Sequence, residues 1–99
     1  MNHHLSLASR VRIPESIASH ALHGEMLIVN TTTGACVSLD PIGTRIWRLL
    51  QEHRFLQKVL NALVQEYDVT EAQGAHDLIR FAALLQEKGF AEVCTEETR

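Results

Sequence analysis

The side chains that most often carry chemistry are scattered along this sequence. The two cysteines, Cys36 and Cys94, form no CxxC pair, and the six histidines include no pair with the HExxH spacing. A nucleophilic cysteine needs a base and a group that orients the base, and both cysteines are isolated from such partners in the sequence. We therefore expect no catalytic residues, and we expect both cysteines to be reduced, with Cys36 a partly buried strand residue.

Phosphate and metal chemistry find equally little support. The carboxylates fall in unrelated predicted elements, and the sequence has no glycine-rich phosphate loop and no elbow serine. Met1-Asn2-His3 offers an amine, two amides and an imidazole, a donor set that Cu(II) and Ni(II) accept when Met1 is unmodified. We do not expect this to be a biological function, and we predict no metal site and no cofactor.

Composition indicates a small globular protein. The chain has 99 residues, of which 45% are hydrophobic and 21% charged. These values predict one domain with an ordered core over about residues 8–93. A net charge of −3 argues against nucleic-acid binding and against an anionic membrane surface. With neither a membrane-spanning run nor a signal segment visible, we expect a cytoplasmic protein.

The first part of the chain has the period of β-strands. Val11 and Ile13 alternate with arginines in a short predicted strand that Pro14 ends. Residues 15–23 are ambiguous between a turn and one helical turn. Two strands follow, over residues 25–30 and 35–39, and the Gly34 loop between them predicts an antiparallel hairpin.

The second part has the period of helices, which makes the expected fold class α+β: a three-stranded antiparallel sheet followed by three helices. Asp40-Pro41 predicts a helix start, and the sequence Thr70-Glu71-Ala72-Gln73 predicts a capping box for a third helix that begins at Glu71 and ends near Lys88. A short strand over residues 90–93 is also compatible with the sequence. We expect Trp47 to be at least half buried, and we expect an apolar stripe on the first helix and another on the second: Ile42, Ile46, Leu49 and Leu50; Leu56, Val59, Leu60, Leu63 and Val64.

The third helix is apolar over more of its circumference than one core contact requires. Its core stripe is formed by Ala75, Leu78, Ile79, Ala82 and Leu85. Phe81 and Leu84 fall outside this stripe, on a flank shared with Asp77. Two interpretations are open: the flank packs on the sheet or on Phe90, or it lines an exposed groove.

The predicted third strand lies at an edge of the sheet and carries no charge and no proline, the usual means of blocking an edge. An open edge beside an apolar helix flank suits an extended peptide, unless another strand or a dimer partner covers it. We predict that a peptide pairs with the backbone of this strand and sets apolar side chains against Phe81 and Leu84. Asp77 receives a cation or an amide of the peptide, or it pairs with Arg80. The predicted binding residues are Cys36, Val37, Ser38, Leu39, Asp77, Phe81 and Leu84.

An ordered set of short motifs resembles PqqD-like proteins. It runs through Leu27-Ile28-Val29-Asn30, Thr33-Gly34, Leu39-Asp40, Gly43, Ile46-Trp47 and Leu49-Leu50, and continues through Leu63, Glu66-Tyr67-Asp68-Val69, Asp77-Leu78, Phe81, Leu84-Leu85 and Gly89-Phe90. The resemblance covers about residues 25–91. It implies a winged-helix-like domain that is not an enzyme. Such a protein binds the leader of a ribosomally made precursor peptide and presents it to a modifying enzyme, such as a radical S-adenosylmethionine enzyme or a leader protease. The resemblance places the leader between the third strand and the third helix.

The sequence also bears on the kind of precursor, on an alternative function and on oligomeric state. Members that act in pyrroloquinoline quinone synthesis tend to carry Pro-Glu where this chain has Asn30-Thr31-Thr32, which favours a PqqD-like recognition element for another precursor peptide. The alternative function is that of a winged-helix DNA-binding protein. The outward arc of the third helix, with His76, Arg80, Ala83 and Glu87, is too poor in basic groups for it. A homodimer through an open strand edge is also expected in the absence of a leader.

Overall fold

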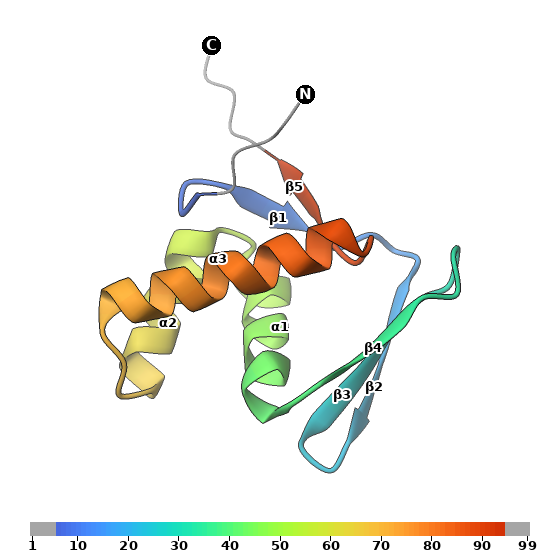
Figure 1. Ribbon diagram of the computed structural model, residues 1–99, viewed down its shortest axis with the longest axis horizontal. Coiled ribbons are helices and arrows are strands. Elements are labelled where there is room, and N and C mark those ends of the chain that lie inside the picture. The colour runs from blue at the N-terminus through green and yellow to red at the C-terminus, as the bar shows by residue number, and fades with distance from the viewer. Residues whose placement is uncertain (1–5, 95–99) are drawn as a thin grey trace.

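The computed structural model describes residues 6–94, so the Met1-Asn2-His3 motif lies outside the described residues. Two small sheets flank three helices, and the larger sheet extends away from the helices (Figure 1). The elements are, in chain order, β1 (Arg10–Arg12), β2 (Ile17–Leu22), β3 (Glu25–Asn30), β4 (Cys36–Leu39), α1 (Pro41–His53), α2 (Leu56–Glu66), α3 (Glu71–Glu87) and β5 (Glu92–Cys94).

The three-stranded antiparallel sheet exists, but its first strand is not the expected one. Its order is β2-β3-β4, and β1 pairs instead with β5 in a separate two-stranded sheet. The segment expected to be a turn or a helical turn is therefore strand β2. It reverses into β3 through His23-Gly24, whose φ angles of 50° and 84° are those of a tight hairpin turn. A histidine rarely adopts positive φ, which is why this turn is hard to predict from sequence.

The helix boundaries follow the local chemistry that the sequence predicts. The Asp40 carboxylate accepts a hydrogen bond from the Gly43 amide at 2.7 Å, with Pro41 in the first turn of α1. Arg54, at φ 70°, ends α1 and separates it from α2. The Thr70 hydroxyl caps α3 by accepting from the Gln73 amide at 3.1 Å. The Gln73 side chain does not complete a capping box, because it donates to the Asp77 carboxylate at 3.0 Å.

The core lies where the helices meet the inner face of the large sheet. Trp47 is 1% exposed, which confirms its predicted burial. Ile28 of the sheet and Phe90, just after α3, are completely buried in the same cluster. The stripe predicted for α1 is wrong at one position, because Ile42 is 55% exposed. Ile42 lies in the first turn of α1, close to the end of β4 at Leu39.

An exposed ion pair joins α1 to α2. The Arg45 guanidinium donates to the Glu66 carboxylate, with Nε and Oε1 2.8 Å apart. This hydrogen bond lowers the pKa of Glu66 and raises that of Arg45. Because both side chains are in contact with water, the pair contributes little to stability.

Candidate functional site

The β4 edge of the large sheet is open in the described structure, because β4 pairs with β3 on one side and with no strand on the other. The Asn30 amide donates to the Ala35 carbonyl at 2.8 Å, which fixes the phase of the ladder. In an antiparallel pair every second residue turns its N–H and C=O toward the partner strand. Val37 and Leu39 therefore turn their backbone groups toward β3, and Cys36 and Ser38 turn theirs toward the open side.

The side chains of β4 alternate between the inner and outer faces of the sheet. Val37 and Leu39 lie opposite Ile28 and Met26 on the inner face, where Leu39 is buried and Val37 partly buried. Cys36 and Ser38 project from the outer face, and both are exposed. The expectation of a partly buried Cys36 is thus wrong, because a strand at a sheet edge has no neighbour to cover its outer side. Both Cys36 and Cys94 are free thiols, as predicted.

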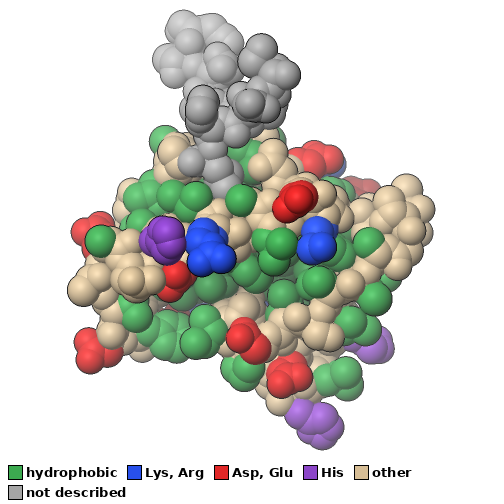
Figure 2. All heavy atoms as spheres, in the orientation of Figure 1, with side chains coloured by type: hydrophobic (Ala, Val, Ile, Leu, Met, Phe, Trp, Pro, Cys, Tyr) green, Lys and Arg blue, Asp and Glu red, His purple; other side chains and the backbone are tan. Residues whose placement is uncertain are grey.

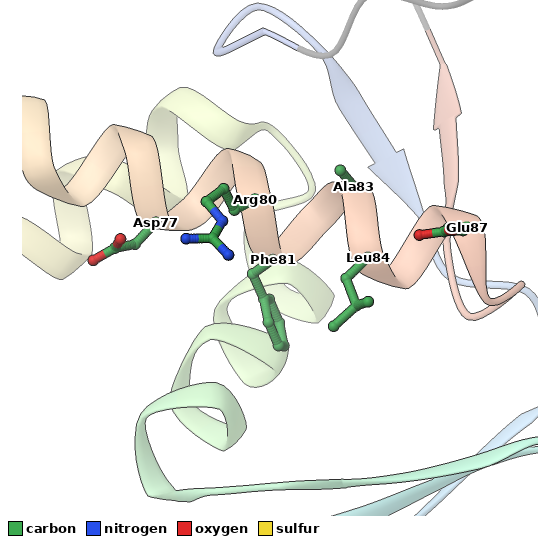
Figure 3. Close-up of a pocket in the computed structure, with 6 residues that line it drawn as sticks. All are labelled: Asp77, Arg80, Phe81, Ala83, Leu84 and Glu87. Carbon is green, nitrogen blue, oxygen red and sulfur yellow. The ribbon is translucent and has the colours of Figure 1, made fainter.

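Helix α3 supplies the opposite wall. Phe81 and Leu84 point from α3 toward the sheet, whereas Ala83 points away from it (Figure 3). Leu84 is 42% exposed and Phe81 is partly buried against the core. Of the two interpretations of this flank, the exposed groove is therefore the correct one for Leu84, while Phe81 both borders the groove and supports the core.

These two walls enclose one groove of about 460 Å³. It brings together six of the seven predicted binding residues: Val37, Ser38, Leu39, Asp77, Phe81 and Leu84. Cys36 does not line it, consistent with its outward side chain. Hydrophobic side chains gather in the strip between α3 and the sheet, with charged side chains on both sides (Figure 2).

The floor of the groove comes from α1 and was not predicted. Asp40, Ile42, Gly43 and Ile46 complete the lining. A Cβ atom on Gly43 would lie 3.6 Å from Phe81 Cε1, an ordinary contact, and 3.1 Å from Asp40 Oδ1, so a side chain here would crowd the helix cap rather than α3. The exposure of Ile42 could have been inferred from its place in the first helical turn, directly after the open strand.

The apolar surface continues past the end of β4. A smaller hollow of about 130 Å³ lies between α1, the end of α2 and the start of α3. It shares Ile42, Ile46 and Asp77 with the groove, and Tyr67 and Val69 are among its other lining residues. The groove and this hollow are therefore adjacent and share part of their lining.

Two carboxylates are the ionisable groups of the groove lining. The Asp40 carboxylate accepts the capping hydrogen bond from the Gly43 amide, and the Asp77 carboxylate accepts one from the Gln73 side chain. The pairing of Asp77 with Arg80, one of two expected roles, is not among the ion pairs of residues 6–94. Arg80 and Asp77 both line a second hollow of about 440 Å³ along α3, together with Phe81, Ala83, Leu84 and Glu87. Within the same residues, no cluster of His, Cys, Asp and Glu could hold a metal ion.

The fold and the groove define a small α+β domain with an apolar channel beside an open strand edge. The chain belongs to the PqqD family: the family model described as coenzyme PQQ synthesis protein D (PqqD) matches residues 25–91. No curated protein matches the sequence.

Two solved structures are similar to this chain. TbiB1 in complex with the TbiA(beta) leader peptide has 27% sequence identity and a TM-score of 0.78, over 89% of this chain and 99% of that one. Lasso peptide synthetase B1 complexed with the leader peptide has 20% identity and a TM-score of 0.76, over 84% and 98% of the two chains. The second similarity supports the fold alone. In the described part of this chain, no helix has the length and apolar character needed to cross a membrane.

Proposed function

We propose that this protein is a non-catalytic adaptor that binds the leader segment of a ribosomally synthesised precursor peptide and presents it to a modifying enzyme. The observation that carries the proposal is the groove between β4 and α3, open along a strand edge and apolar at its walls. The similar TbiB1 structure, solved with a leader peptide, supports the same assignment.

The leader adds to the sheet as a fourth strand beside β4. Its backbone pairs with the outward N–H and C=O groups of Cys36 and Ser38, which gives affinity without reading sequence. Alternate leader side chains then point inward, against Phe81 and Leu84, and the others point outward. The groove thus selects apolar residues at every second position, and Asp77 accepts an amide or a cation beside them.

The groove lining offers binding surface but no means of catalysis. Ser38 is its one hydroxyl, and it has no histidine or lysine within the lining to act as a base. The chemistry then belongs to the partner, a radical S-adenosylmethionine enzyme or a leader protease. The DNA-binding alternative is disfavoured, because the hollow along α3 contains the carboxylates of Asp77 and Glu87 against the one guanidinium of Arg80 and cannot supply the phosphate contacts.

Ser38→Pro is expected to weaken leader binding by at least about tenfold, because proline removes the outward N–H that pairs with the peptide. The β3–β4 ladder does not use this N–H, and proline is tolerated at such edge positions. The measurement is titration calorimetry with the cognate leader peptide, to be sought among the open reading frames next to this chain's gene. Ser19→Pro, the matched change on the opposite edge of the sheet, should leave the affinity unchanged. Equal affinity in both variants would exclude pairing at β4.

The thiols are expected to be dispensable. A Cys36→Ser, Cys94→Ser double variant should bind the leader as the native protein does, because Cys36 contributes backbone groups to the edge and Cys94 lies in β5. Calorimetry with the same leader tests this, and circular dichroism checks the fold. A folded double variant that no longer binds would show that a thiol takes part in recognition.

A further inference from the structure

Strand β2 forms the other edge of the three-stranded sheet, and it is as open as β4. Five of its six residues are exposed, from Ala18 to Leu22. The strand contains no proline and no Asp, Glu, Lys or Arg, the residues that normally protect an edge from pairing. His20 is its one titratable side chain, and Leu22 is 54% exposed.

The backbone of β2 presents a defined set of unpaired groups. The Thr31 amide donates to the Ser16 carbonyl at 2.8 Å, so Ser16 is turned toward β3. By the alternation of the ladder, Ala18, His20 and Leu22 are also turned toward β3, and Ser19 and Ala21 direct their N–H and C=O groups outward. The Ile17 amide is already used, since it donates to the Pro14 carbonyl at 3.1 Å.

The outward backbone groups of β2 can pair with the same groups of a second β2 strand. When two β2 strands run antiparallel about a twofold axis at His20, Ser19 of one copy lies opposite the partner subunit's Ala21, and the reverse pair forms as well. All the outward groups of Ser19 and Ala21 are then satisfied. A shift of two residues in either direction would leave some of them unpaired or would require the Ile17 amide. Small side chains on the inner face and the absence of formal charge let the strands approach without repulsion.

We infer that β2 is a self-association edge, through which a second copy of this chain joins the sheet to give six continuous strands. The strand order β4-β3-β2 places β4 at both outer ends of such a sheet. A dimer of this kind keeps both β4–α3 grooves open. The assignment of β4 to the leader rests on the proposed function, but the pairing of β2 does not depend on it.

Sedimentation velocity of the full chain over a concentration series tests the inference. The expected result is a concentration-dependent species of twice the 11.1 kDa chain mass. Ser19→Pro removes one outward N–H per chain, hence two hydrogen bonds per dimer, and should raise the dimer dissociation constant at least about tenfold. His20→Glu places like charges opposite each other at the axis and should act in the same direction without altering the backbone.

Ser38→Pro on β4 is the matched control and should leave the dimer intact. A chain that stays monomeric at all concentrations overturns the inference, as does a dimer that neither β2 variant weakens or that Ser38→Pro abolishes. If Ser19→Pro fails to fold, His20→Glu decides. Loss of leader binding in Ser38→Pro with the dimer retained supports both assignments. Undiminished leader binding in that variant counts against the proposed function alone.

Discussion

Leu84→Asp is expected to reduce leader affinity by at least about 100-fold, because it places a carboxylate in the apolar wall of the groove, where a bound leader would have to desolvate it. Leu84 is 42% exposed and lies opposite β4, so it is free to contact a bound peptide. The change should cost the free protein little stability, since the new charge remains hydrated until the peptide covers it. Titration calorimetry with the leader measures the loss.

His76→Asp is the matched control for this substitution. His76 is exposed on α3 and lines none of the hollows described above, so the same new charge on the same helix should not alter affinity. Glu87 is less suitable, because it borders the hollow along α3 together with Leu84. Undiminished binding by a folded Leu84→Asp variant would exclude this groove as the leader site. The search would then move to the β1–β5 sheet near Val11 and Ile13.

Phe81→Ala is expected to weaken leader binding by about 2 kcal/mol, about 30-fold, if the ring anchors the centre of the interface. Phe81 borders the groove at the point where α3 approaches Gly43 of α1. The measurement is again calorimetry with the leader, accompanied by circular dichroism of each variant.

Phe81 also supports the core, so its truncation should lower the unfolding free energy as well. Phe81→Leu separates the two roles, because it keeps most of the apolar volume. Its stability should stay near that of the native protein, and its affinity should fall between those of the native protein and Phe81→Ala. If binding and stability fall in strict proportion across both variants, Phe81 acts on the groove only through the fold.

The sequence by itself determined the elements whose signals are local. Asp40-Pro41 and Thr70 start helices because a capping oxygen and a missing amide act within one turn. The hairpin before α1 and the burial of Trp47 follow from equally short-range patterns. The apolar flank of α3 was visible for the same reason: Phe81 and Leu84 lie outside the arc that one core contact can cover.

Tertiary structure alone decided which strands share a sheet and where the edges lie. Short strands of similar composition do not encode their partners, so β1 pairs with β5, about 80 residues away, and β2 takes the expected place of β1. Tertiary packing also brought Gly43 of α1 close to Phe81 and left Cys36 exposed on the outer face of β4. Because β1 pairs elsewhere, β2 is left as an edge strand. Local sequence indicates which secondary structure a residue favours. Its solvent exposure depends on which distant segments pack against it, and these contacts form only when the sheet and the helices come together.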